Sequence, residues 1–281
     1  MSHTPIGATV PEAEPFAKVL ERMNRFQEPE ARALIADLEL PRGSHGLDAG
    51  CGVGLYALWL AEAVGPQGRV VGIEPSAERV EAARALVGHA WPTASLEFRQ
   101  GDATAIDAAD ATFDWVWCGD VLHHVQETGR ALGEFVRVLR PGGRLIVKES
   151  QLLHGLLLPG HPALERRLRQ AEMETSRHEG GEFSFEERRQ RTLASLRAAG
   201  LRVDSFRTYL LERRAPLPEA TRDYLLRVVF ERNWGPRLRD LLTPADWAER
   251  STLCDAASPA LILDDRDYYC LYPISVLAAR R

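Results

Sequence analysis

Three glycines at every second position follow an acidic residue and could hold a nucleotide-like ligand. Asp48 precedes Gly50, Gly52 and Gly54, and Leu55 begins a run with apolar residues at helical spacing. Glycine takes positive φ values readily and lets backbone N–H groups approach a ligand closely. The stretch therefore predicts a strand, a tight glycine turn and a helix that together bind a cofactor related to a nucleotide.

The spacing of these glycines argues against two common phosphate-binding motifs. A dinucleotide-binding G-x-G-x-x-G motif that begins at Gly50 needs a glycine at position 55, where the chain has Leu55. A P-loop needs Gly-Lys-Ser/Thr, which the turn lacks. A lone glycine triplet is weak evidence, so its interpretation depends on the segments that follow.

Further carboxylates come directly after apolar runs. Glu74 ends such a run 20 residues after Gly54, near the spacing at which an acid accepts hydrogen bonds from both ribose hydroxyls. Asp102 and Asp120 follow the next two runs. Ligands of open α/β sheets bind beyond the carboxyl ends of the strands, so we expect these acids to lie around one site.

Adjacent His123 and His124 could supply proton transfer. An imidazole with its ordinary pKa of about 6.5 is a competent base at neutral pH. If residues 120–125 form a helical turn, Asp120 shares a face with one of the two histidines, would orient its ring and would raise its pKa. We favour His124 slightly as the general base. Packing of the histidines against cofactor or core is the alternative.

Strands and helices alternate through residues 46–149, which predicts a parallel sheet covered on both faces. Two later runs predict an antiparallel pair that completes the sheet. The expected strands are 46–49, 69–74, 95–100, 113–118, 144–149, 201–212 and 266–277. The expected helices begin at Leu55 and after the N-cap Ser76, and span 128–139, 161–176 and 184–199.

The segments outside this alternation are mostly helical. Two helices broken near Pro29 should follow a mobile start rich in proline and glycine. The expected divisions are a helical cap at 1–45, a core at 46–150, the rest of the core with substrate-side helices at 151–215, a helical lid insertion at 216–263 and a final strand at 264–281.

The insertion interleaves arginines with aromatic residues, and two interpretations stay open. Its aromatic side chains could line a pocket while its arginines bind an acidic substrate. Alternatively, it is an amphipathic cap with a solvated basic face, which we favour. The arginines are Arg222, Arg227, Arg232, Arg237, Arg239 and Arg250, and the aromatic residues are Tyr224, Phe230, Trp234 and Trp247.

Composition narrows the functional classes. The 281 residues carry a net charge of −5, so nothing global indicates nucleic acid or an anionic membrane as a partner. We expect no signal peptide, because residues 1–15 contain no apolar h-region, and no apolar run approaches the ~20 residues of a membrane helix. The cysteines lack metal spacing, and we expect reduced thiols in a cytoplasmic protein. They are Cys51, Cys118, Cys254 and Cys270.

The remaining histidines show no metal-binding spacing, and we expect surface or loop positions for them. They are His3, His45, His89, His154, His161 and His178.

Five segments in order over about a hundred residues carry a specific resemblance. The segments are Leu-Asp-Ala-Gly-Cys-Gly-Val-Gly (47–54), Val-Val-Gly-Ile-Glu-Pro-Ser (70–76), Gly-Asp-Ala (101–103), Phe-Asp-Trp-Val-Trp-Cys-Gly-Asp-Val-Leu-His-His-Val (113–125) and Leu-Arg-Pro-Gly-Gly-Arg-Leu (139–145). The chain resembles class I S-adenosylmethionine-dependent methyltransferases, most closely the small-molecule group with the ubiquinone and menaquinone C-methyltransferases.

The resemblance implies a Rossmann-like α/β fold with seven strands in the order 3-2-1-4-5-7-6, strand 7 antiparallel, and a helical insertion between the last two strands. It implies that Asp48 lies near the methionine ammonium, that Glu74 binds the ribose, and that Asp102 and Ala103 bind the adenine. The implied cofactor-binding residues are Asp48, Gly50, Cys51, Gly52, Gly54, Glu74, Pro75, Asp102, Ala103, Cys118 and Gly119. Asp120, His123 and His124 are the catalytic candidates.

We therefore expect methyl transfer from S-adenosylmethionine to an oxygen, nitrogen or carbon nucleophile of a small molecule, by in-line displacement. The alternative is a regulator of the same fold that binds the cofactor without turnover. An NAD-dependent oxidoreductase is disfavoured because position 55 lacks the glycine. Protein or RNA methylation is disfavoured because the chain has no basic stripe and no Asn-Pro-Pro-Tyr-type segment. A homodimer is compatible with the sequence.

Overall fold

The computed structural model describes residues 15–87, 95–150, 155–178 and 185–281. Of residues 1–15, which the sequence predicts to be mobile, only Pro15 is among the described residues. His3, His89 and His154 also lie outside the described residues. Of the other histidines, His45 departs from the surface position expected for it. It begins a strand, and its ring lies 4.7 Å from that of Phe113.

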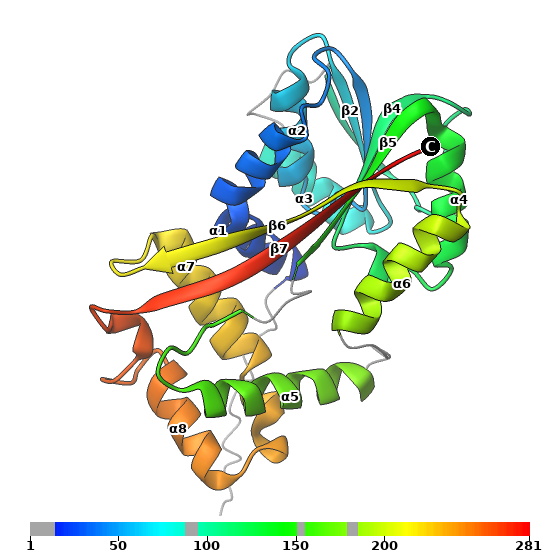
Figure 1. Ribbon diagram of the computed structural model, residues 1–281. Coiled ribbons are helices and arrows are strands. Elements are labelled where there is room, and N and C mark those ends of the chain that lie inside the picture. Colours follow the sequence, from blue (N-terminus) through cyan, green and yellow to red (C-terminus); the bar gives the residue numbers. More distant parts are fainter. Residues whose placement is uncertain (1–14, 88–94, 151–154, 179–184) are drawn as a thin grey trace, which may run out of the picture.

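One sheet of seven strands organises the protein (Figure 1). Its order, β3-β2-β1-β4-β5-β7-β6, and the antiparallel pairing of β7 with both neighbours confirm the predicted topology. The strands are β1 (His45–Ala49), β2 (Arg69–Glu74), β3 (Leu96–Gln100), β4 (Phe113–Gly119), β5 (Leu139–Ser150), β6 (Arg202–Arg214) and β7 (Tyr269–Arg280).

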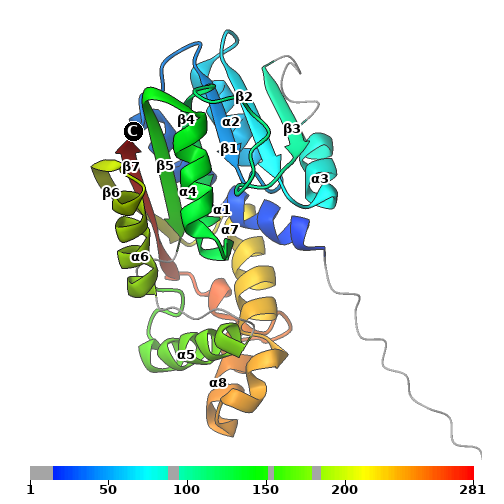
Figure 2. The same ribbon diagram turned by 90° about the vertical axis from the view of Figure 1, so that its right-hand side faces the viewer.

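Helices cover both faces of the sheet, as the alternation predicts (Figures 1 and 2). Side chains of β4 alternate between two hydrophobic clusters, because successive residues of a strand point to opposite faces. Trp115 and Trp117 join one cluster, and Val116 and Cys118 join the other. The first cluster includes α1 (Phe16–Asp37), α2 (Leu55–Val64) and α3 (Ala77–Val87). The second includes α4 (Thr128–Val138) and α6 (Phe185–Ala198).

Helix α1 runs without interruption, so the predicted break near Pro29 is wrong. A proline inside a helix removes one backbone hydrogen bond and costs about 3 kcal/mol. Tertiary contacts hold this helix together on both sides of the proline. Phe26 is buried, and Arg213 of β6 donates hydrogen bonds to its carbonyl oxygen at 2.9 Å and to Glu30 at 2.6 Å.

Strand β5 begins earlier than the sequence suggested. Leu139 already pairs with Phe113, and the register then shifts so that Arg144 pairs with Trp115. Pro141, Gly142 and Gly143 therefore lie within an irregular start of the strand rather than before it.

A helical lobe stands beyond the carboxyl ends of the parallel strands (Figures 1 and 2). Most of it is the predicted insertion between β6 and β7, and α5 packs with this insertion through α8 and η3. The lobe consists of α5 (Pro162–His178), α7 (Glu219–Asp223), the π-helical η2 (Tyr224–Asn233), η3 (Pro236–Leu241), α8 (Pro244–Cys254) and η4 (Ile262–Asp264).

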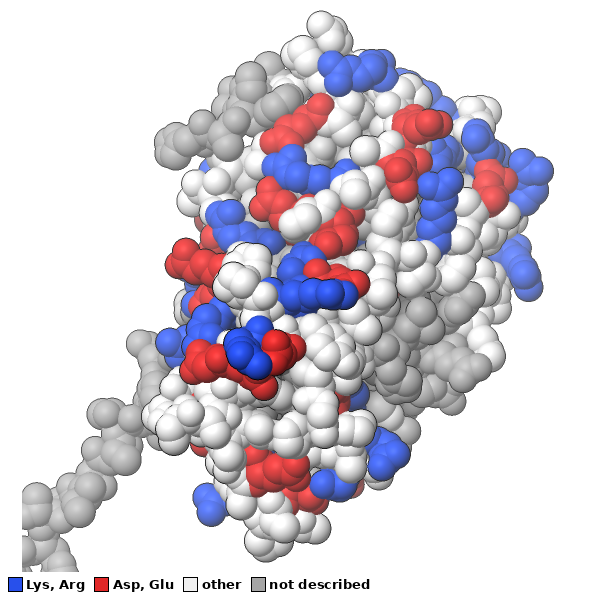
Figure 3. Space-filling view, turned by 60° about the vertical axis from the view of Figure 1, so that its left-hand side comes forward, with Lys and Arg blue, Asp and Glu red and all other residues white. Residues whose placement is uncertain are grey.

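Positive and negative side chains are mixed on the face of the molecule that Figure 3 shows. On the face seen in Figure 3, Lys and Arg alternate with Asp and Glu without forming a continuous basic stripe. The four cysteines are buried and form no disulfide. Among the described helices, none is long and apolar enough to cross a membrane.

Candidate active site

The glycine turn after β1 has a backbone that only glycine adopts readily. Gly50, Gly52 and Gly54 have φ values of 82°, 55° and 80°. A Cβ at Gly50 would stand 2.4 Å from Val121, and one at Gly54 would stand 2.6 Å from Phe98. The turn is fixed to the neighbouring strand because the amides of Gly50 and Cys51 both donate to the Ile73 carbonyl oxygen. It is therefore a closely packed backbone turn that is fixed to β2.

Asp48, the last acid before the turn, is buried with one oxygen unused. The residue is 2% exposed, and its Oδ2 atom has no hydrogen-bond partner in the structure. Burial, and secondarily the charge of Glu74, raises the pKa of Asp48 to about 8. A buried carboxylate without a partner is costly, and a cationic group placed beside it would remove that cost.

Glu74, at the carboxyl end of β2, is held from two sides. Its Oε2 accepts a hydrogen bond from the Gly52 amide at 3.2 Å, which ties the acid to the glycine turn. Its Oε1 accepts from Ser76 N at 3.1 Å and from Arg79 Nε at 2.8 Å. Glu74, which the resemblance implies as the ribose-binding acid, therefore lies at the glycine turn. Its ion pair with Arg79 was not predicted from the sequence.

The predicted adenine side of the site follows β3. Asp102 Oδ1 accepts from the amide and the hydroxyl of Thr104, at 2.7 and 2.8 Å, and these bonds lower its pKa. Ala103 beside it is buried. Pro75, after β2, is connected to the end of β3 because its carbonyl accepts from Gln100 Nε2 at 3.0 Å.

Strand β4 carries the remaining predicted cofactor residues. Cys118 is fully buried, and burial raises the pKa of its thiol. Gly119 ends the strand, and a Cβ there would stand 2.8 Å from the Trp117 indole nitrogen. The sheet order places the ends of β3, β2, β1 and β4 in sequence along one edge, which brings the cofactor candidates to the same side of the sheet.

Asp120, directly after β4, belongs to a buried polar network rather than to a histidine pair. It has a left-handed φ of 55°. Its carboxylate pairs with Lys148 and accepts from the Ser150 amide at 2.6 Å. Burial raises the pKa of Asp120, but the Lys148 ammonium outweighs it, so the net shift is downward. The network ties the end of β4 to the end of β5.

Lys148 is the centre of this network and is 1% exposed. Its ammonium donates to Gln27 of α1 at 2.9 Å and to Ser150 at 2.7 Å. The hydroxyl of Tyr56 in α2 donates to the same Gln27 oxygen at 3.0 Å. The Lys148 ammonium also lies 5.0 Å from the centroid of the Tyr56 ring. Burial disfavours the ammonium, but Asp120 outweighs it and the pKa of Lys148 is raised.

The carboxylate that orients a histidine is Glu149. His123 Nδ1 lies 2.8 Å from Glu149 Oε2, and the Glu149 side chain is 3% exposed. His123 and His124 do form a helical turn, η1 (Leu122–His124), and their ring centroids lie 4.0 Å apart. The expectation that Asp120 would orient the histidine is therefore wrong for His123, because the Lys148 network holds Asp120.

Helix α1 covers the glycine turn from the lobe side. Its Leu20 would stand 3.3 Å from a Cβ placed on Gly52. Phe16, at the start of the helix, lies under two guanidinium groups, that of Arg79 at 5.9 Å and that of Arg232 of the lobe at 5.4 Å. Phe16 thus contacts both the predicted ribose region and the insertion.

The charges of the insertion are largely used within the protein. Arg227 pairs with Glu231, and Arg222 pairs with Asp264. Arg250 is 3% exposed and donates to the carbonyl oxygens of Trp234 and Phe230. These contacts favour the interpretation of the insertion as an amphipathic cap over that of an arginine grip on an acidic substrate.

Comparison with known proteins agrees with this geometry. Residues 47–147 match the family model described as "Methyltransferase domain". Residues 47–147 thus resemble a methyltransferase domain. The matched region contains the glycine turn, the ends of β1 to β4 and most of β5, whereas the end of β5, α1 and the lobe lie outside it.

Two curated relatives match part of the chain. The "2-phytyl-1,4-naphtoquinone methyltransferase" of Thermosynechococcus vestitus is 42% identical over 110 residues, which are 39% of this chain and 48% of that protein. The "Demethylmenaquinone methyltransferase" of Shouchella clausii is 35% identical over 113 residues, which are 40% of this chain and 48% of that protein. The resemblance to quinone methyltransferases is confirmed for the domain, and the match spans less than half of either relative.

The fold is shared more widely than the reaction. The solved structure titled "[4+2]-Cyclase SpnF" is 24% identical, covers 90% of this chain and 80% of its own, and has a TM-score of 0.54. The overall fold alone therefore does not specify methyl transfer, and the argument for function rests on the site.

Proposed function

We propose that this protein is an S-adenosylmethionine-dependent methyltransferase of a small molecule. The observation that carries the proposal is the unpartnered, buried Asp48 oxygen beside a glycine turn. A cofactor with a sulfonium and an ammonium, and without phosphate, fits an acidic site of this kind better than a dinucleotide does. The match of residues 47–147 to the methyltransferase domain supports the same choice.

Residues at the ends of different strands would bind different parts of the cofactor. Asp48 would bind near the ammonium, the glycine turn would lie under the methionine and ribose, and Glu74 would accept from the ribose hydroxyls. Asp102 and the Ala103 amide would bind the adenine, and the backbone at Cys118 and Gly119 would hold the methionine end. When bound, the cofactor supplies an electrophilic methyl group on sulfur. The protein aligns the acceptor and excludes water.

We propose His123, in place of the initially favoured His124, as the general base. In the tautomer that carries its proton on Nδ1, the Nδ1–H group donates a hydrogen bond to Glu149 and Nε2 keeps a lone pair that can accept a proton. Nδ1 is 2.8 Å from a nearly buried carboxylate, so the ring orientation is fixed. A fixed imidazole suits an acceptor that must lose a proton, such as a hydroxyl.

His123→Gln tests this role. We expect turnover to fall by about 10²–10⁴, as for loss of a general base, while S-adenosylhomocysteine binds with unchanged affinity. The assay uses radiolabelled S-adenosylmethionine with a panel of phenols, hydroxylated quinones and amines, followed by product analysis. The panel includes quinones because the domain's relatives are named as quinone methyltransferases.

His161→Gln is a matched control. His161 Nδ1 also lies close to a carboxylate, 2.9 Å from Glu249, but this pair is partly exposed on the lobe. Turnover should stay at the wild-type level. Equal losses in turnover and in cofactor affinity for His123→Gln would assign that residue to packing. Tight cofactor binding without any methylated product across the panel would favour the non-catalytic regulator.

A further inference from the structure

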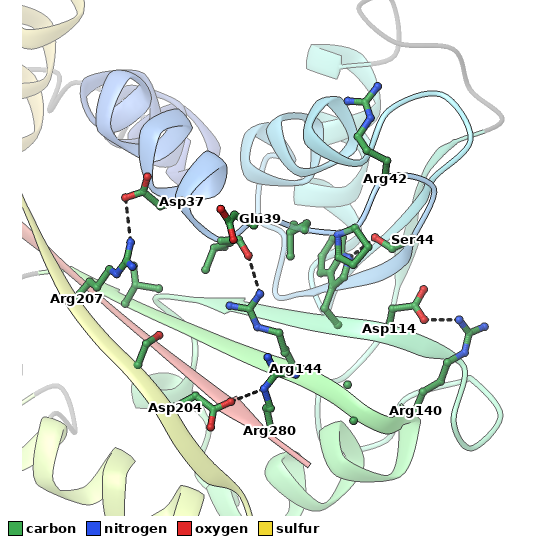
Figure 4. A pocket seen from close by; sticks show the side chains of 18 of the residues that line it. Asp37, Glu39, Arg42, Ser44, Asp114, Arg140, Arg144, Asp204, Arg207 and Arg280 are labelled. Atoms are coloured by element: carbon green, nitrogen blue, oxygen red, sulfur yellow. Dashed lines mark hydrogen bonds and ion pairs between the residues drawn. The ribbon is translucent and has the colours of Figure 1, made fainter.

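A second cleft lies at the other end of the sheet (Figure 4). It opens between residues 37–44, where α1 leads into β1, and the ends of β5, β6 and β7, and its volume is about 770 Å³. That volume falls within the range of about 300–1,000 Å³ for small-molecule sites. We call it the amino-end cleft, because it is at the amino ends of the parallel strands. The proposed cofactor site is at their carboxyl ends.

Three arginines stand in a row across three adjacent strands beside this cleft. Arg144 of β5 is the register partner of Arg280 in β7, and Arg280 is in turn the partner of Arg202 in β6. Like charges placed directly opposite each other destabilise a sheet. Such a row therefore needs counter-charges.

Asp204 neutralises only two members of the row. Its carboxylate lies 2.6 Å from Arg280 Nε and 3.3 Å from Arg202 Nη2. Two other arginines of the cleft are paired, Arg140 with Asp114 and Arg207 with Asp37, whereas Arg42 donates to the Ala63 carbonyl oxygen at 3.3 Å (Figure 4).

Arg144 is the member that lacks an ion pair within the described part of the chain. Its one hydrogen bond is from Nη1 to the Leu38 carbonyl oxygen at 2.6 Å. Burial lowers the pKa of Arg144, and the charge of Arg280 lowers it further, while Asp204 and Glu39 offset part of this repulsion. A half-buried guanidinium that is repelled by its neighbour and keeps unused N–H donors is suited to an external anion.

We propose that the amino-end cleft binds a small anion with carboxylate or phosphate groups, held by Arg144 together with Arg280. The planar guanidinium matches both oxyanions through paired hydrogen bonds. An anion between the two guanidiniums would neutralise the repulsion that Asp204 leaves uncompensated. The site uses no residue of the glycine turn and no candidate base, so it stands independently of the proposed methyl transfer.

Calorimetric titration of the full chain tests the proposal. The probes are sodium pyrophosphate, ATP and citrate, each titrated against sodium chloride at matched ionic strength. We expect saturable binding of at least one probe. Preference for pyrophosphate and ATP would identify a phosphate ligand, and preference for citrate would identify a carboxylate ligand.

Variants of Arg144 locate the binding. Arg144→Gln should weaken binding by about tenfold or more, and Arg144→Lys, which keeps the charge but loses the planar fork, should give an intermediate loss. Arg266→Gln is the matched control, because Arg266 is a highly exposed arginine outside the cleft that pairs with Asp267. It should bind as the wild type does. Unchanged S-adenosylhomocysteine affinity in Arg144→Gln would show that the fold is intact.

Two results would overturn the proposal. One is the absence of saturable binding for all three probes. The other is an equal response of wild type, Arg144→Gln and Arg266→Gln, which would show an adventitious ion only.

Discussion

The two ends of the sheet hold their charges in opposite ways. At the carboxyl end, Lys148 and Asp48 are almost fully buried, the first inside a polar network and the second with an oxygen unused. At the amino end, pairs such as Arg140 with Asp114 are open to solvent. Buried charges have large energetic effects and fix geometry, whereas exposed pairs contribute little. The comparison therefore predicts a graded series of effects.

Lys148→Met should cause the largest loss of stability. Removing one partner of a buried ion pair leaves the Asp120 carboxylate uncompensated, and we expect a loss of about 3–5 kcal/mol in the free energy of unfolding. Urea denaturation of the ligand-free protein measures this. The double variant Asp120→Asn/Lys148→Met should recover part of the loss. A loss below about 1 kcal/mol in the single variant would contradict the contrast between the two ends.

Glu74→Ala should come next, through ligand binding. We expect S-adenosylhomocysteine affinity to fall by about 1–3 kcal/mol, because the ribose hydroxyls would lose a buried acceptor. Glu97→Ala is a suitable control, since Glu97 is a partly exposed acid on β3 that pairs with Arg99 and Arg69. If Glu74→Ala bound S-adenosylhomocysteine with wild-type affinity, Glu74 would not be a cofactor-binding residue.

Asp48 should make the ligand-free protein less stable as the pH rises. Its pKa is raised to about 8 in the folded state and is near 3.8 when exposed, so between these values the folded state holds the extra proton. The free energy of unfolding should therefore decrease with pH over this window, by up to about 1.4 kcal/mol per pH unit from this group.

The measurement compares Asp48→Asn with wild type from pH 4.5 to 8.5. The variant cannot ionise at this position, so its advantage over wild type should grow toward pH 8 and then level off. A stability difference that does not change with pH would show that Asp48 ionises without penalty in the folded state.

Arg140→Gln should have the smallest effect. Both partners of its pair with Asp114 are partly exposed, and such pairs contribute about 0–1 kcal/mol. Denaturation at low and high salt should give nearly the same small difference from wild type. If Arg140→Gln lost as much free energy of unfolding as Lys148→Met, the contrast between buried charges at the carboxyl end and exposed charges at the amino end would be wrong.

The core could be predicted from sequence because its signals are local. The glycines at 50, 52 and 54 need positive φ, Asp48 lies one residue before the end of β1, and Glu74 ends β2. Such features are encoded within a few residues, and their alternation predicts a parallel sheet completed by an antiparallel pair. The strand order itself was implied by the family resemblance, and the structure confirms it.

The errors arise where distant segments meet. Nothing near Pro29 shows that Arg213 will stabilise the helix around it. Likewise, the sequence pairs Asp120 with the nearby histidines, whereas the fold brings Lys148 to Asp120 and Glu149 to His123. A lysine at the end of an apolar strand was the one available signal, because a buried ammonium requires a carboxylate partner.

The position of α1 has a kinetic consequence. Leu20 lies against the glycine turn, and Phe16 lies under guanidinium groups from both the domain and the lobe. If the turn holds the cofactor, we expect the first turns of α1 to shift when spent cofactor leaves. If that shift is slower than the chemical step, turnover falls as the viscosity of the solvent increases.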